Sequence, residues 1–266
     1  TPERVETRVG TLEFFDGFPT EKTAERLAEH LDFIRGVEAF LTAMPSASAE
    51  AIRRGFGDLG VSRNNVVGIF QNLLDARSLY LTANTESIYF GCWLDLREGP
   101  VVVESPPNTL GMVNDFFFRY VADLGNAGPD KGKGGKFLFL PPDWEGDVPD
   151  GYFTFRSPTY GNLLFWRGFV VDGDPAPTVK QIKETVRIYP LHWPSDREDT
   201  RLVEMSGIPH NTIHANTIDF YREIREVIRD EPAAAFSPEV LGLLAAIGIE
   251  KGARFEPNKR LRATLT

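Results

Sequence analysis

Residues 125–174 read GNAGPDKGKGGKFLFLPPDWEGDVPDGYFTFRSPTYGNLLFWRGFVVDGD, and this stretch decides the fold class. Three short apolar runs, at 137–140, 152–155 and 163–171, are separated by loops rich in Gly, Pro and Asp. Such a cadence is typical of consecutive antiparallel strands joined by tight connections.

The same alternation of apolar and polar residues extends towards the N-terminus. It predicts further strands at 66–70, 87–96, 101–104 and 112–121, which makes about seven in total. No helix-length segment separates them, so antiparallel pairing is favoured over a βαβ arrangement. We therefore expect an antiparallel β-sandwich domain, Greek-key or jelly-roll-like, over residues 61–175.

Helical patterns flank this region at both ends, which makes the expected fold class α+β. Residues 1–60 form a predicted helical segment packed on the sandwich, in which Met44-Pro45 ends one helix and a second helix covers 46–56. Five apolar residues recur at helical spacing in the first helix. They are Leu27, Leu31, Ile34, Val37 and Leu41.

Residues 176–266 return to the helical period. The segment 179–186 fits a short helix or a strand, and 217–229 is amphipathic. Ser237 is positioned to cap a last helix over 239–247, with Pro238 in its first turn.

Composition excludes several classes of protein. The chain has 266 residues, with 29 basic and 38 acidic side chains and a formal charge of −9. An acidic surface repels a phosphate backbone, so no nucleic-acid partner is expected. No apolar run approaches the ~18 residues of a membrane-spanning helix, so no transmembrane segment is expected. Cys92 stands alone in an apolar strand, which predicts a buried, inert thiol and no intrachain disulfide.

Several blocks of sequence resemble a known bacterial family. They are 81–107 (LTANTESIYFGCWLDLREGPVVVESPP), 125–144 (GNAGPDKGKGGKFLFLPPDW) and 166–175 (WRGFVVDGDP). The family is domain of unknown function 1254. The resemblance implies a second, C-terminal β-sandwich domain after the helical segment, absent from this chain, and a periplasmic or cell-envelope location. It carries over no catalytic residue, and a chain that begins at Thr1 shows no targeting signal.

Two groups of residues are candidates for ligand binding. Asn84, Glu86 and Tyr89 lie at and just before the start of a strand, although Asn84 also fits a simple Asx turn. Arg119, Arg156 and Arg167 interrupt aromatic strands, where an arginine either forms an ion pair or contacts a ligand. The plausible ion-pair partners are Asp115, Asp123, Glu86 and Asp95.

The loop from Gly132 to Lys136 invites comparison with a phosphate-binding loop. The required spacing fails, because Asp130 stands where a P-loop has Gly, and a strand follows instead of a helix. A tight strand connection is the favoured interpretation. The alternative is a basic loop, including Lys131, that meets an anionic or sugar ligand.

His210 and His214 have the i, i+4 spacing of paired metal ligands on a helix. Gly207 and Pro209 disfavour a helix there, and no carboxylate lies between the histidines. They are weak metal candidates, and we expect neither a metal site nor a cofactor.

These observations favour an envelope protein that binds a small or carbohydrate-like ligand or acts structurally. The alternative is a hydrolase whose cleft lies at the junction with the C-terminal domain, so enzymatic activity is left open. A homo-oligomer is expected. Apolar residues near the C-terminus should then be exposed or covered by another copy. They are Leu241, Leu244, Ile247 and Ile249.

Overall fold

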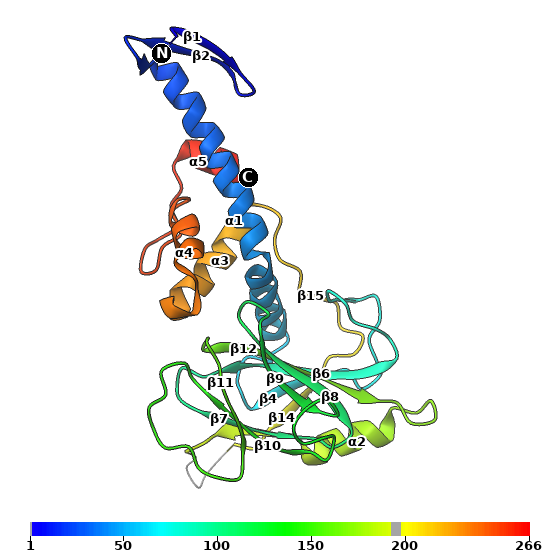
Figure 1. Ribbon diagram of the computed structural model, residues 1–266. Coiled ribbons are helices and arrows are strands. Elements are labelled where there is room, and N and C mark those ends of the chain that lie inside the picture. The colour runs from blue at the N-terminus through cyan, green and yellow to red at the C-terminus, as the bar shows by residue number, and fades with distance from the viewer. Residues whose placement is uncertain (1, 193–197) are drawn as a thin grey trace. The chain divides into compact units, whose positions relative to one another are not determined.

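The computed structural model describes residues 2–192 and 198–266, and it confirms the α+β class (Figure 1). The chain divides into two compact units. One consists of Thr1–Met44, Ala215–Arg229 and Phe236–Thr266. The other consists of Pro45–His214 and Asp230–Ala235, and it contains the two large sheets.

The larger sheet has six strands in the order β14-β4-β6-β12-β8-β9. Their bounds are Arg201–Glu204 (β14), Val66–Ile69 (β4), Ser87–Asp95 (β6), Gly161–Phe169 (β12), Thr109–Asp115 (β8) and Tyr120–Gly125 (β9). The predicted strand at 112–121 is therefore two strands, because a turn at residues 116–119 reverses the chain. β12 lies in the centre of this sheet, antiparallel to both β6 and β8.

The second sheet has four strands in the order β11-β10-β7-β13. Their bounds are Phe153–Arg156 (β11), Gly135–Leu140 (β10), Val101–Ser105 (β7) and Arg187–Pro190 (β13). A two-stranded sheet pairs β15 (His210–Asn211) with β5 (Ser78–Leu79). The expectation of antiparallel pairing is wrong for three pairs, which are parallel: β10 with β11, β14 with β4, and β15 with β5.

The parallel pairing of β10 and β11 follows from the long connection between them. A hairpin turn needs two to five residues, whereas Pro141 to Tyr152 provide enough chain to return and re-enter in the same direction. Phe137 pairs with Phe153 and Phe139 with Phe155. β11 is an edge strand of this sheet, and its Phe153 is partly exposed.

Trp166 of β12 links the two large sheets. Its indole stacks on Phe90 with 4.8 Å between ring centroids, and its Nε1–H donates to Ser105 Oγ of β7 at 3.2 Å. Gly111 on β8 leaves room for the ring, since a Cβ there would lie 2.2 Å from Trp166 Cδ1. All of Trp166 is buried, so the alternate residues of β12 point to the opposite face of the sheet.

Helix α1 (Glu21–Asp58) is continuous, so the prediction that Met44-Pro45 ends a helix is wrong. Pro45 removes one backbone donor, the N–H that would bond to the carbonyl of Leu41, but the helix continues beyond it. The residues after Pro45 bury most of their side chains, which offsets the lost bond. Helix α2 (Ala176–Thr185) resolves the open alternative at 179–186, and it packs on β12 where Gly168 leaves space for Thr178 and Ile182.

The first unit contains a small antiparallel sheet and the remaining helices. Its elements are β1 (Arg4–Thr7), β2 (Gly10–Phe15), β3 (Phe18–Pro19), α3 (Ile218–Asp230), α4 (Pro238–Ala245) and α5 (Lys259–Leu265), and the 3-10 turn Ala233–Ala235 follows α3 in the other unit. Tyr221 of α3 donates to the carbonyl of Gly36 at 3.0 Å, and Arg260 of α5 pairs with Asp32 at 2.8 Å. Ser237 caps α4 as predicted, accepting from the N–H of Val240.

The expectation that four C-terminal apolar residues are exposed is wrong for three of them, and the fourth, Leu241, is half-buried. Leu244, Ile247 and Ile249 are each at most 1% exposed. The turn after α4 buries them, because the N–H groups of both isoleucines bond back to Leu244. Exposed apolar side chains lie instead along α1, including Leu31 and Leu41.

Cys92 is fully buried in β6, which confirms the expected burial, and burial raises the pKa of its thiol. A thiol with a raised pKa is a poor nucleophile at neutral pH. In the described part of the chain, no helix combines the length and apolar character needed to cross a membrane.

Candidate functional site

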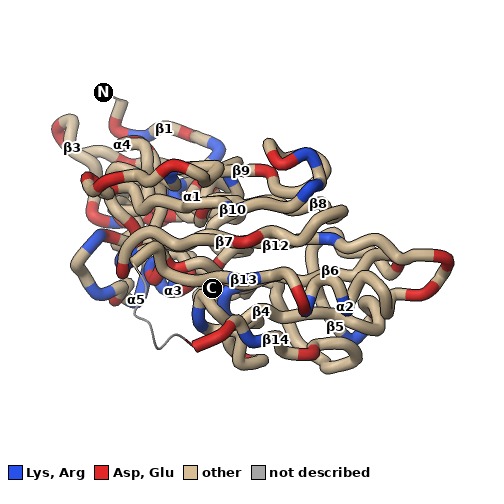
Figure 2. Tube along the Cα trace, turned by 90° about the horizontal axis from the view of Figure 1, so that it is seen from below, with Lys and Arg blue, Asp and Glu red and all other residues tan. Residues whose placement is uncertain are grey.

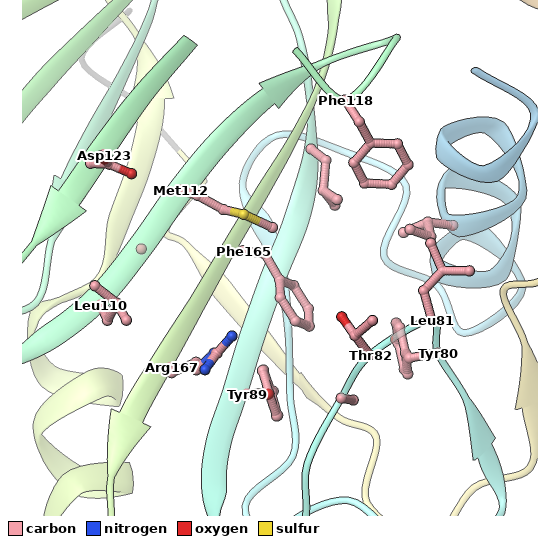
Figure 3. A pocket seen from close by; sticks show the side chains of 14 residues that line it. Tyr80, Leu81, Thr82, Tyr89, Leu110, Met112, Phe118, Asp123, Phe165 and Arg167 are labelled. Carbon is pink, nitrogen blue, oxygen red and sulfur yellow. The ribbon is translucent and has the colours of Figure 1, made fainter. Parts of the chain in front are cut away.

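A cavity of about 280 Å³ lies against the face of the six-stranded sheet opposite to Trp166 (Figure 3). We call it the β12 pocket. Four strands, the turn between β8 and β9, the loop before β6 and the C-terminal half of α1 contribute to it. Its lining residues are Ile52, Tyr80, Leu81, Thr82, Ala83, Tyr89, Leu110, Gly111, Met112, Phe118, Asp123, Leu163, Phe165 and Arg167.

Strand alternation explains why these side chains converge. Phe165 and Arg167 are two residues apart on β12, so they point to one face while Trp166 points to the other. Phe165 pairs with Met112, and Arg167 pairs with Leu110 on one side and Tyr89 on the other. Directly paired residues share a face, so the register of β6, β12 and β8 assembles this wall of the pocket.

The floor of the pocket is aromatic. Phe165 stacks on Tyr89 with ring centroids 5.2 Å apart, and Phe56 of α1 stacks on Phe165 from further away, at 6.3 Å. Gly91 makes room for this arrangement, because a Cβ there would lie 2.5 Å from Phe165 Cδ2. A rigid stack of rings is a suitable surface for the flat or apolar part of a ligand.

Tyr80 closes one side of the pocket and is held by a histidine behind it. His210 Nδ1 lies 2.9 Å from the carbonyl oxygen of Ile208, and its Nε2 lies 3.1 Å from Tyr80 Oη. A carbonyl only accepts, so Nδ1 carries the proton and Nε2 accepts the hydroxyl hydrogen of Tyr80. Burial raises the pKa of Tyr80, so its hydroxyl keeps its proton.

This arrangement changes the interpretation of His210. The residue lies in strand β15 and not on a helix, so the i, i+4 geometry that would pair it with His214 is absent. Its Nε2 lone pair is already used by Tyr80. Within residues 2–192 and 198–266, no group of three or more His, Cys, Asp or Glu side chains has the geometry of a metal site.

Two charged side chains occupy the pocket rim. The Arg167 guanidinium lies over the Tyr89 ring, 5.6 Å from its centroid, and no described carboxylate pairs with it. Asp123 of β9 likewise has no hydrogen-bond or ion-pair partner among the described side chains. Elsewhere basic and acidic residues are interspersed in the view of Figure 2.

The turn from Asp115 to Arg119 places Phe118 at the mouth of the pocket. The fully buried Asp115 carboxylate accepts the N–H of Phe117 at 2.7 Å and that of Arg119 at 3.0 Å. It also accepts a hydrogen bond from Arg119 Nε at 2.5 Å, which is the ion pair that the sequence offered as an alternative to ligand contact. Phe118 has a positive φ of 55°, which is costly for a bulky side chain and is maintained by these bonds.

Asp115→Ala is expected to lower the free energy of unfolding by about 2 kcal/mol, because two backbone N–H groups lose their acceptor. The Arg119 charge adds little, since that side chain is half exposed. Asp115→Asn retains one acceptor oxygen and should cost less than half as much. Urea denaturation of both variants measures this, and equal stability of the alanine variant and the wild type would contradict it.

The predicted residues around β6 lie at different depths. Tyr89 is buried and lines the β12 pocket, and its hydroxyl accepts the N–H of Asn84 at 3.3 Å. Asn84 Oδ1 accepts the N–H of Glu86 at 3.0 Å, so the Asx-type turn is confirmed. The Glu86 side chain is exposed. The loop thus positions Tyr89, and the role of Asn84 and Glu86 in ligand binding stays a prediction.

The other predicted residues lie away from this pocket. Besides Asp115, Arg119 contacts the carbonyl of Ala235 at 2.9 Å. Lys131 lies in an exposed turn with a positive φ of 51°. Arg156 donates to the carbonyls of Pro141 and Pro142 and borders a separate open groove.

The Gly-rich loop around Lys131 has the geometry of a tight connection. The buried carboxylate of Asp130 accepts the N–H of Gly125 at 2.8 Å and that of Gly134 at 3.2 Å. Asp130 is the residue that breaks the P-loop spacing. In the structure it organises the loop from inside, which agrees with the favoured sequence interpretation.

Sequence reasoning missed most of the pocket. Phe165 and Tyr80 were not singled out, Arg167 was noted only as one of three strand arginines, and Asp123 only as a partner for them. The available signal was alternation on β12: Leu163, Phe165 and Arg167 share one face. Without the partner register, it does not reveal which residues of β8 and β9 join that face.

The fold and the pocket can now be compared with known proteins. Residues 64–190 match the model of DUF1254, a family described as protein of unknown function. The resemblance seen in the sequence is thus confirmed for the segment that contains β4 to β13. The DUF1254 segment includes every lining residue of the β12 pocket except Ile52.

A solved structure shares this fold. The VPA0106 protein from Vibrio parahaemolyticus has a TM-score of 0.58 and 16% sequence identity to this chain. The match covers 88% of this chain and 56% of that protein, so the chain spans little more than half the length of its neighbour. No curated protein matches the sequence.

Proposed function

We propose that this protein binds a small, largely apolar molecule in the β12 pocket. The observation that carries the proposal is the convergence of an aromatic floor with a few polar groups in one cavity. Ligand sites in proteins commonly have this character, mostly apolar walls with a few polar groups that fix orientation. Tyr80, Thr82 and Tyr89 provide the hydroxyl groups here.

Side chains that line the pocket are held in place by neighbouring residues, which supports the proposal. Phe165 is fixed by stacking on Tyr89 and by the space left at Gly91, and Tyr80 is fixed by His210. Side chains that are ordered before binding lose little conformational entropy when a ligand arrives. An apolar or aromatic ligand therefore fits this wall better than a hydrophilic sugar, which needs more polar partners than the pocket offers.

Two finer statements accompany this proposal. A sandwich arrangement of the two large sheets is supported by the Trp166–Ser105 bond between them. A cell-envelope location is supported by the resemblance to DUF1254. The hydrolase alternative and the expected homo-oligomer stay predictions.

A thermal-shift screen tests the proposal. We expect apolar alcohols and aromatic compounds to raise the Tm of the protein and monosaccharides to leave it unchanged. A ligand present at one hundred times its Kd adds about 2.7 kcal/mol to the free energy of unfolding, which is readily measured.

A pair of variants locates the effect. Met112→Trp should fill the pocket mouth and abolish the shift, whereas Val148→Trp, at an exposed apolar position outside the pocket lining, should retain it. A shift of equal size in both variants, or none in the wild type across the screen, would refute ligand binding at this pocket.

A further inference from the structure

We propose that the ligand of the β12 pocket carries an anionic group at one end and an amine at the other, joined by an apolar body. This inference rests on the proposed function and specifies its ligand class. It follows from the positions of Arg167 and Asp123 on the same wall of the pocket, with an apolar strip between them (Figure 3).

The sheet register places the two charges on one face. Arg167 pairs with Leu110, Leu110 pairs with Gly125, and Asp123 is two residues from Gly125 on β9. Paired residues share a face and so do residues two apart on a strand. Both side chains therefore rise from the face that carries Phe165.

The same register separates them. Three neighbouring strands at about 4.8 Å spacing and two residues at about 3.4 Å place the two Cα atoms about 12 Å apart. β8 lies between them and contributes Leu110 and Met112 to the surface that joins the two charges. The charges are therefore positioned to contact opposite ends of one molecule.

Both charges are available for a ligand. Two other arginines of this unit are already engaged: Arg119 by Asp115, and Arg156 by two proline carbonyls. Arg167 instead lies over the Tyr89 ring, a contact that orients the guanidinium without neutralising it. Asp123 has no partner in the described part of the chain, so its carboxylate can accept hydrogen bonds from an ammonium group.

The chemistry of each end follows. A guanidinium with free N–H groups favours a planar carboxylate, which it binds through two parallel hydrogen bonds. A carboxylate without a partner at the other end repels a second anion and favours a cation. Leu110, Met112 and Phe165 favour methylene or aromatic groups in between. A linear ω-amino carboxylate meets all three requirements.

Isothermal titration with four probes of equal chain length tests the inference: 8-aminooctanoate, octanoate, octylamine and octanol. We expect 8-aminooctanoate to bind most tightly. Arg167→Gln should weaken 8-aminooctanoate and octanoate about fivefold and leave octylamine unchanged, as expected for a partly solvated ion pair. Asp123→Asn should weaken 8-aminooctanoate and octylamine by a similar factor and leave octanoate unchanged.

Arg201→Gln and Asp147→Asn serve as matched controls, because both are exposed charges outside the pocket lining. They should bind all four probes as the wild type does. If octanol binds as tightly as 8-aminooctanoate and Met112→Trp abolishes both, the pocket binds apolar ligands and the charge assignment is wrong. The same conclusion follows if each charge variant weakens all probes equally, or if none of the charged probes binds.

Discussion

Trp166→Ala is expected to lower the free energy of unfolding by about 4 kcal/mol. The side chain is fully buried, stacks on Phe90 at 4.8 Å and donates to Ser105 Oγ across the two large sheets. Its removal opens a cavity under Gly111, whose missing side chain cannot fill the space. The hydroxyl of Ser105 also loses a partner.

Trp166→Phe separates packing from hydrogen bonding. It keeps an aromatic ring against Phe90 but lacks the indole N–H, so about 1–2 kcal/mol should be lost. Urea unfolding followed by circular dichroism measures both variants. A loss below about 1 kcal/mol for the alanine variant would show that the two sheets do not depend on this contact.

Glu231 is expected to make stability depend on pH. The carboxyl is 1% exposed and accepts the N–H groups of Tyr160 at 2.6 Å and Gly161 at 2.8 Å. Burial raises its pKa to about 7, with smaller contributions from Asp95 and Asp230, and this outweighs the two hydrogen bonds. The folded protein therefore favours the protonated carboxyl more than the unfolded chain does.

The sign follows from linkage. A folded-state pKa above the unfolded value adds stability that is present below about pH 4.5 and lost as pH rises through about 7. Glu231→Gln keeps the acceptor oxygen for one N–H and removes the titration. Its stability relative to the wild type should therefore rise by about 2–3 kcal/mol between about pH 5 and about pH 8. A constant difference between the two proteins over this range would contradict the raised pKa.

Local patterns predicted several strands of the unit that contains the two large sheets. Alternation located β4, β6, β7, β10 and β12 to within a few residues, because each has at least one strongly apolar face. The hairpin between β8 and β9 was not predicted. Its turn contains Phe116 and Phe117, and apolar residues at these positions look like the continuation of a strand.

Long-range pairing was not predictable from the same patterns. The parallel partners of β10 and β4 are set by the course of the connections in space, which leave no periodic mark on the sequence. The prediction that a helix ends at Pro45 was wrong for another reason. A proline inside a helix normally ends it, but here the tertiary burial of Ala47, Ala51 and Ile52 outweighs that preference.

The candidate site, too, was only partly predictable from the sequence. Tyr89 was identified because it lies next to a polar loop, and it does line the pocket. Arg119 and Arg156 looked equivalent to Arg167 in the sequence, yet the nearby Asp115 and the two proline carbonyls engage them. Which arginine lacks such a partner depends on strand register, so only the structure distinguishes them.

Methyl NMR of methionine tests the central claim most directly, since the chain has three methionines and one of them, Met112, lines the β12 pocket. With 13C-methyl methionine and 8-aminooctanoate, the Met112 signal, assigned with Met112→Leu, should shift in a saturable manner. Met205 is fully buried and outside the pocket lining, so its signal should stay in place. An unchanged Met112 signal at saturating concentrations of all four eight-carbon probes would contradict ligand binding in the β12 pocket.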